Sequence, residues 1–168
     1  MITLFRGLQN SQTTIEILIY LFLIILIISL VVGLVLFILS AVALRRMAVR
    51  EGRQNAWMAF VPFMNLYLFG EIARDDSDKS WIQAIPLTLL LGSIGYLVIH
   101  FVPGIGMLYS LCFNGLVLYV SYLVFNKYSH SPVPLLIVSV VTFGMAIPFI
   151  LFAIRNNDKV DIVLPPNH

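Results

Sequence analysis

Long apolar runs without charged residues are the main feature of this chain. The first runs from Ile17 to Leu44 and is followed at once by a basic segment that contains Arg45, Arg46, Arg50 and Arg53. A helix of about 20 apolar residues can cross a bilayer, and arginines beside such a helix mark the side that is not translocated. The pattern therefore predicts a membrane-spanning helix over about 15–44, with segment 45–53 in the cytoplasm.

Three further charge-free runs have the length of a membrane span. They predict helices over about 81–101, 107–125 and 132–154, joined by short connections. The link Val102–Gly106 contains a proline and two glycines, which favour a tight turn over a continuing helix. The tail over 155–168 is expected to be extended.

Segment 56–73 is ambiguous. It is apolar, but Pro62 and Asn65 lie near its centre and Glu71 near its end. Eighteen residues of helix reach about 27 Å, which is barely the thickness of the hydrocarbon layer. Its aromatic side chains favour an interface, so we expect a broken, partly re-entrant or interfacial helix and keep a fifth span as the alternative.

Composition agrees with a membrane protein. The chain is 60% hydrophobic and 11% charged, with a mean hydropathy of +0.98. Its 168 residues have room for four or five spans and short loops. The expected fold is an all-α integral membrane protein, a compact bundle forming one membrane-embedded domain over 1–168. The net charge of +2 comes mostly from the basic segment, which indicates anionic headgroups as a partner and no nucleic acid.

The distribution of lysine and arginine orients the first helix but not the last. With five spans, six of the ten basic residues lie inside; with four, seven do. Both arrangements place the N-terminus outside, and the difference of one residue leaves the side of the C-terminus open.

Small and polar residues recur at helical spacing in each predicted span. In the third span these are Ser110, Asn114 and Ser121. Such residues allow close backbone approach and hydrogen bonds between helices, so we expect these faces to point into the bundle. Asn114 is the most polar side chain in these spans, and its amide needs partners, which a neighbouring helix would provide.

The sequence offers little support for catalysis. No charged residue lies between Ile17 and Leu44 or in the other three predicted spans, and the three histidines lack partners at metal-ligand spacing. We therefore predict no catalytic residue, no metal site and no cofactor. Glu71 is the one acidic group near membrane depth; beside Arg74 it is expected to form an interfacial ion pair.

One segment carries a resemblance to known proteins. Trp57, Pro62, Asn65, Tyr67 and Gly70 form the pattern W-x4-PFxNxYxxG, and the chain closes its last apolar run with Phe-Ala-Ile-Arg-Asn at 152–156. Both motifs resemble small polytopic membrane proteins of Gram-positive bacteria whose function is unassigned. The resemblance implies a multi-pass protein of a bacterial cytoplasmic membrane and no particular reaction.

Two classes of function follow. The first is a non-enzymatic membrane interaction protein, an accessory, regulatory or immunity-type subunit that acts through helix contacts with a membrane protein partner. Its candidate partner or lipid contacts are Trp57, Pro62, Asn65, Tyr67, Gly70 and Glu71. The second is a small transporter, channel or lipid-binding protein, as a single chain or a homo-oligomer, that uses Asn114 and the serine stripes. Polar stripes that pack dry would favour the first class, and stripes that line a cavity the second.

Overall fold

The computed structural model describes residues 2–74, 80–99, 101–102 and 104–160, and side chains from Thr14 onward. Every regular element in these ranges is helical, which confirms the predicted all-α class. The elements are α1 (Ile2–Arg50), η1 (Ala56–Phe60), α2 (Met64–Ala73), α3 (Ser80–Ile99), α4 (Ile105–Tyr128), α5 (Pro132–Val141) and α6 (Ile147–Ile154).

The chain divides into two units, Met1–Phe37 and Ile38–His168. The first unit consists of α1 residues, and its described apolar side chains are exposed except for the half-buried Leu36 and Phe37, as expected for a helix whose surface meets lipid. Helix α1 is longer at both ends than the predicted 15–44. The basic segment continues it to Arg50, since nothing in Arg45–Arg50 interrupts helical hydrogen bonding.

A glycine ends α1. Gly52 adopts φ +72°, and the amide of Arg53 donates to the carbonyl of Ala48 while that of Gly52 donates to Val49. These two bonds are a Schellman motif, which satisfies the last carbonyls of a helix and reverses the chain. The chain therefore turns back as soon as it leaves α1.

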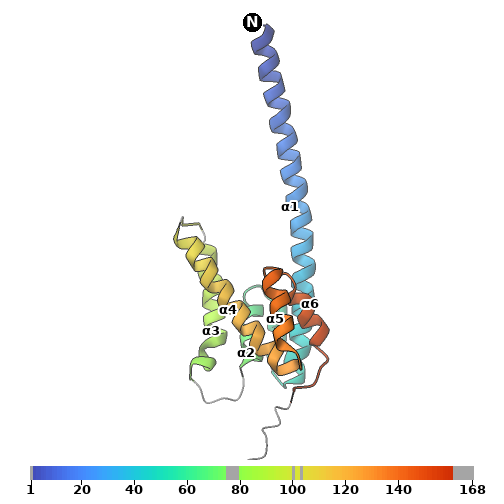
Figure 1. The fold of residues 1–168 in the computed structure, drawn as a ribbon, viewed down its shortest axis with the longest axis vertical. Helices are drawn as coiled ribbons and strands as arrows, with labels where there is room; N and C mark the ends of the chain where they lie inside the picture. The colour runs from blue at the N-terminus through green and yellow to red at the C-terminus, as the bar shows by residue number, and fades with distance from the viewer. Residues whose placement is uncertain (1, 75–79, 100, 103, 161–168) are drawn as a thin grey trace, which may run out of the picture. The chain divides into compact units, whose positions relative to one another are not determined.

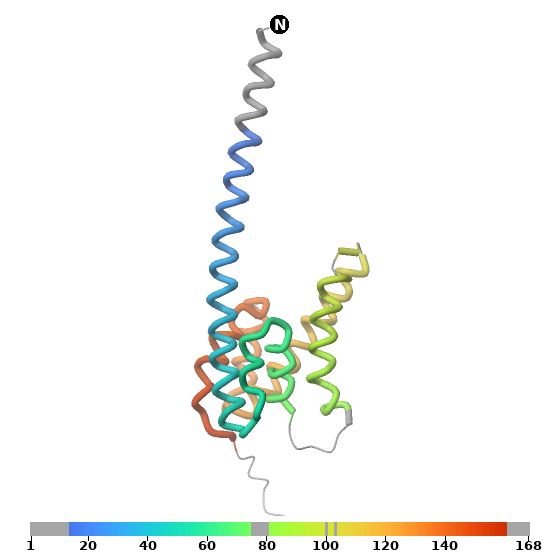
Figure 2. Tube along the Cα trace, turned by 180° about the vertical axis from the view of Figure 1, so that it is seen from behind, coloured from blue at the N-terminus to red at the C-terminus, as the bar shows by residue number. Residues whose placement is uncertain are grey.

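The ambiguous segment 56–73 is broken into η1 and α2. Pro62 separates the two helices, and Phe63 takes the unusual φ of +67° before α2 begins. Figure 2 shows this green segment rising beside the end of α1 and then doubling back. Arg53, just before the segment, and Glu71, near its end, form an ion pair of 2.9 Å, so the segment is a helical hairpin that returns to its starting end.

Helices α3 and α4 form an antiparallel pair. The hydroxyl of Tyr109 donates to the carbonyl of Gly92 at 2.8 Å, and a Cβ on Gly95 would lie 2.6 Å from the same hydroxyl. The absence of side chains at these glycines thus allows the aromatic residues of α4 to approach the backbone of α3. Both helices are long and apolar enough to span a membrane.

The prediction of a single spanning helix over 132–154 is wrong. Two short helices, α5 and α6, are joined by a turn in which Phe143 has φ +51° and Gly144 φ +83°. The break lies at Gly144 and Pro148 together: Gly144 adopts a left-handed conformation that reverses the chain, and Pro148, which has no amide hydrogen to donate, lies in the first turn of α6. Neither helix is long enough to span, and the described residues contain three candidate spans, in α1, α3 and α4, in place of the four predicted.

The hydrophobic core of the second unit lies toward one end of α4. From α4 it contains Val120, Val124 and Phe125, all fully buried, whereas Met107, Leu108 and Leu111 near the other end are exposed. The end of α1, the hairpin η1–α2, the first half of α3 and helix α6 supply the remaining core residues. Figure 1 shows α2, α5 and α6 gathered around this half of α4, while α3 and α4 extend beyond them.

Candidate functional site

A buried carboxylate lies where the ends of several helices meet. The side chain of Glu51, just after α1, is 3% exposed. Its Oε1 accepts a hydrogen bond from the hydroxyl of Tyr128 at 2.6 Å and lies 2.5 Å from Nζ of Lys127, both at the end of α4. Nζ of Lys159, from the segment after α6, is 3.7 Å away. Glu51 therefore ties three distant parts of the sequence together.

The surroundings of Glu51 favour its charged form. Burial by itself raises the pKa of this carboxyl, but the hydrogen bonds from Lys127 and Tyr128 and the positive charges of Lys127 and Lys159 outweigh it. The net result is a pKa below the ordinary value for glutamate. The carboxylate thus remains ionised in the folded protein at neutral pH.

Arg53 connects Glu51 to a second carboxylate. Its Nε lies 3.4 Å from Glu51 Oε2, and its terminal nitrogens bind Glu71 through the carboxylate at 2.9 Å and the backbone carbonyl at 3.1 Å. Arg74 lies 3.5 Å from the other oxygen of Glu71, so the predicted pair with Arg74 is present. Arg53 is the closer partner and fixes the hairpin to the end of α1.

The segment 155–160 crosses this end of the unit as a strap. Arg50 forms an ion pair with Asp158 and donates to the carbonyl of Asn157 at 2.9 Å. The side chain of Asn157 donates to the carbonyl of Tyr128 at 3.0 Å, and the amide of Val160 donates to that of Lys127 at 2.9 Å. The end of α6 is thereby held beside the ends of α1 and α4.

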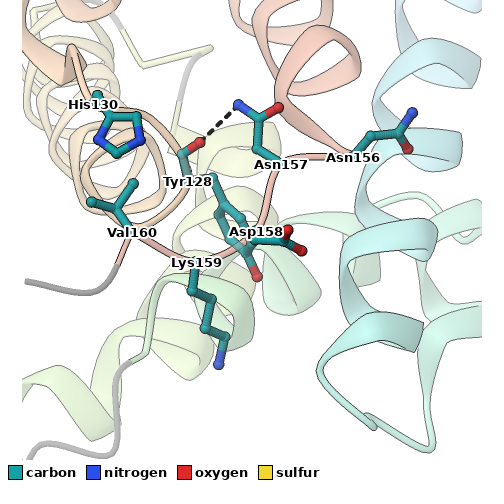
Figure 3. A pocket seen from close by; sticks show the side chains of 7 residues that line it. All are labelled: Tyr128, His130, Asn156, Asn157, Asp158, Lys159 and Val160. Carbon is teal, nitrogen blue, oxygen red and sulfur yellow. Dashed lines mark hydrogen bonds between the residues drawn. The ribbon is translucent and has the colours of Figure 1, made fainter.

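An open hollow of about 670 Å³ lies between the strap and the end of α4. In Figure 3 the imidazole of His130 and the side chain of Val160 lie close together, while the amine of Lys159 points away from them. The hollow is lined by Tyr128, His130, Asn156, Asn157, Asp158, Lys159 and Val160. Its polar groups are mostly engaged in holding the strap, so we assign it no chemistry. Across the described residues, His, Cys, Asp and Glu form no group of three that could hold a metal ion.

All eight lysine and arginine side chains that the structure describes lie at this same end. They come from the last turns of α1 and the following turn, the end of α2, the end of α4 and the strap. They are Arg45, Arg46, Arg50, Arg53, Arg74, Lys127, Arg155 and Lys159. We call this the cation-rich end.

The structure separates the predicted contact residues of the hairpin into two groups. Trp57 and Pro62 are exposed. Asn65 is buried and donates to the carbonyl of Ala59 at 3.2 Å, and a Cβ on Gly70 would lie 2.7 Å from Cα of Pro86 in α3. Asn65 and Gly70 thus hold the hairpin and its contact with α3. Tyr67 is half-buried, with its hydroxyl 3.5 Å from Glu71.

The polar stripe of α4 also divides. Ser121 is fully buried and donates to the carbonyl of Val117 at 2.7 Å. Asn114 is exposed, and its amide nitrogen donates to the carbonyl of Ser110 at 2.8 Å, within its own helix. The expected bond from Asn114 to another helix is absent from the described part of the chain.

Sequence reasoning missed Glu51, Lys127, Tyr128 and Lys159 as a group. The available signal was that Glu51 is the one acidic residue inside the basic segment 45–53. A lone carboxylate among arginines at the edge of a membrane needs no distant partner, so its link to α4 requires the fold. No family model, curated protein or solved structure matches this chain.

Proposed function

We propose that this protein is a non-enzymatic membrane interaction protein, an accessory, regulatory or immunity-type subunit that recognises a membrane protein partner through helix contacts in the bilayer. The observation that carries the proposal is the exposed amide of Asn114 on α4, a candidate membrane-spanning helix. Its amide nitrogen donates to the carbonyl of Ser110 within α4, and no described residue donates a hydrogen bond to its amide oxygen. Lipid chains cannot donate a hydrogen bond, whereas a neighbouring helix can.

The surroundings of Asn114 suit a helix contact. Leu111 and Met107 lie one and two turns earlier, respectively, on the same face of α4, and both are more than two-thirds exposed. Asn114 also lies fourteen residues before Tyr128, so it is about 21 Å from the cation-rich end along the helix axis. This depth is well inside a hydrocarbon layer of about 30 Å, where a polar contact is most selective.

The buried polar groups favour this reading over a transport path. Ser121 and Ser139 are fully buried and donate to carbonyls of their own helices. The described hollow contains neither residue. Dry packing of these serines was the sequence feature expected of an interaction protein.

The orientation follows from the charges. We place the cation-rich end in the cytoplasm and the N-terminus outside a bacterial cytoplasmic membrane, with crossings by α1, α3 and α4. Both hairpins, η1–α2 and α5–α6, then dip into the cytoplasmic half of the bilayer, because their ends are anchored among the cations.

Site-specific photocrosslinking tests the proposed contact. A photoreactive residue at Leu111 should give a discrete protein adduct in native membranes, either with a foreign protein or with a second copy. Asn114→Leu should reduce that adduct at least several-fold. Asn126→Leu makes the same chemical change in an exposed asparagine near the end of α4 and should leave the adduct unchanged. An adduct of equal yield in both variants would remove Asn114 from the contact.

A further inference from the structure

The basic segment contains two kinds of arginine. Arg50 and Arg53 are engaged in the ion pairs with Asp158, Glu51 and Glu71. Arg45 and Arg46 are exposed and take part in no ion pair among the described residues; Arg45 instead lies over the ring of Phe60 at 5.8 Å. The charges of this second pair are therefore available to a ligand.

The exposed side chains around these two arginines form one surface. Helical residues are separated by about 100°, so Val42 and Val49 lie between Arg45 and Arg46 on the same face of α1. Both valines are exposed. This face therefore presents an apolar strip flanked by two guanidinium groups.

Helix η1 extends this surface. Phe60 brings η1 next to Arg45, and Trp57 lies one turn earlier in this 3-10 helix with 58% of its surface exposed. Exposed aromatic rings beside arginines are typical of the level at which headgroups meet acyl chains. Arg45 lies five residues before Arg50, so its charge is about 7.5 Å farther from the end of α1. This distance places the charge of Arg45 on the bilayer side of the ion network.

We propose that this surface, formed by Val42, Arg45, Arg46, Val49, Trp57 and Phe60, binds an anionic phospholipid of the leaflet that contacts the cation-rich end. The two guanidinium groups hold the phosphate, since arginine donates paired hydrogen bonds to phosphate oxygens. The valines and aromatic rings contact the acyl chains. The positive charges on this face match an anionic headgroup. They offer no negative partner to the positive group of a zwitterionic headgroup.

The two tryptophans of the chain provide the test. Trp57 belongs to the proposed surface, whereas Trp81, at the start of α3, is 52% exposed and pairs with Tyr119 at 6.0 Å. Single-tryptophan proteins, Trp81→Phe and Trp57→Phe, would be placed in vesicles of phosphatidylcholine with a fifth of phosphatidylglycerol. In one set only the phosphatidylglycerol carries bromine near the headgroup end of its chains; in the other set, an equal amount of phosphatidylcholine does.

A retained anionic lipid should quench Trp57 more strongly than the bulk composition allows. One surface charge favours anionic lipid on the order of five-fold, so we expect the phosphatidylglycerol-to-phosphatidylcholine quenching ratio of Trp57 to be at least twice that of Trp81. Arg45→Gln with Arg46→Gln should bring the Trp57 ratio down to that of Trp81, and Arg155→Gln should not change it. Equal ratios for the two tryptophans in the unmodified basic segment would overturn the proposal, and this comparison stands even where the arginine variant fails to fold.

Discussion

Glu51→Gln tests whether the buried carboxylate holds the cation-rich end together. The substitution keeps the shape of the side chain and one acceptor oxygen but removes the charge that faces Lys127 at 2.5 Å, Arg53 at 3.4 Å and Lys159 at 3.7 Å. Removing one partner of a buried ion pair costs about 3 to 5 kcal/mol. Because Lys127 also donates to the carbonyl of Ile72 at 3.0 Å, we expect a loss near the lower figure, about 3 kcal/mol.

Thermal unfolding of the purified protein in detergent measures this loss. A destabilisation of that size corresponds to a decrease in Tm of roughly 6 to 12 °C for a chain of this length. Glu16→Gln is the matched control, because Glu16 is an exposed glutamate of the first unit. Combining Glu51→Gln with Lys127→Met should recover part of the loss, since no buried ammonium then lacks its carboxylate. Equal Tm values for Glu51→Gln and Glu16→Gln would refute the role of this network.

Three further predictions concern topology, the second hairpin and pH. In a background without the native cysteine, Ile105→Cys should react with an impermeant thiol reagent added to intact cells. Asn156→Cys should react only after the cells are permeabilised. Labelling of Asn156→Cys in intact cells would contradict the α5–α6 hairpin. Gly144→Ala should destabilise by about 1 to 2 kcal/mol, because φ +83° strains any side chain, whereas Gly33→Ala, at an open helical position, should lower Tm little if at all in the same assay. Because the pKa of Glu51 is lowered in the folded protein, its ionised form stabilises the fold fully at pH values above the ordinary glutamate pKa of about 4.3. This stabilisation is lost as the pH falls through the pKa of the folded state. We therefore expect Tm to decrease between about pH 5 and pH 3 by more in the native chain than in Glu51→Gln.

The apolar runs predicted α1, α3 and α4 because uninterrupted hydropathy is sufficient to identify a spanning helix. The same criterion failed over 132–154, where Gly144 and Pro148 interrupt the backbone without interrupting the hydropathy. A proline in an apolar run does not by itself indicate a break. Pro86 lies inside α3, where it is buried against Gly70 of α2, and the helix continues. The break at Pro148 differs from Pro86 in having a glycine, Gly144, four residues before the proline, at a point where the chain can reverse.

The residues of the cation-rich end were less predictable than the helices. The basic segment was evident, but the sequence treats its four arginines alike. Only the fold separates Arg50 and Arg53, which bind carboxylates from the strap and the hairpin, from Arg45 and Arg46, which face outward. That distinction depends on the end of α4 and the strap arriving beside α1, and contacts over such sequence separation cannot be inferred from local patterns.

The two hairpins also change the meaning of the charge distribution. Four or five spans leave three or four of the ten basic residues outside, which is a weak orientation signal. The proposed arrangement of three spans, with both hairpins returning to the side from which they start, places nine of the ten basic residues on one side and Arg6 alone on the other. The breaks at Pro62 and Gly144 come from the structure and not from the positive-inside rule. The arrangement with both breaks nevertheless follows that rule far better than four or five continuous spans do. Charge therefore gives independent support to the hairpins that hydropathy conceals.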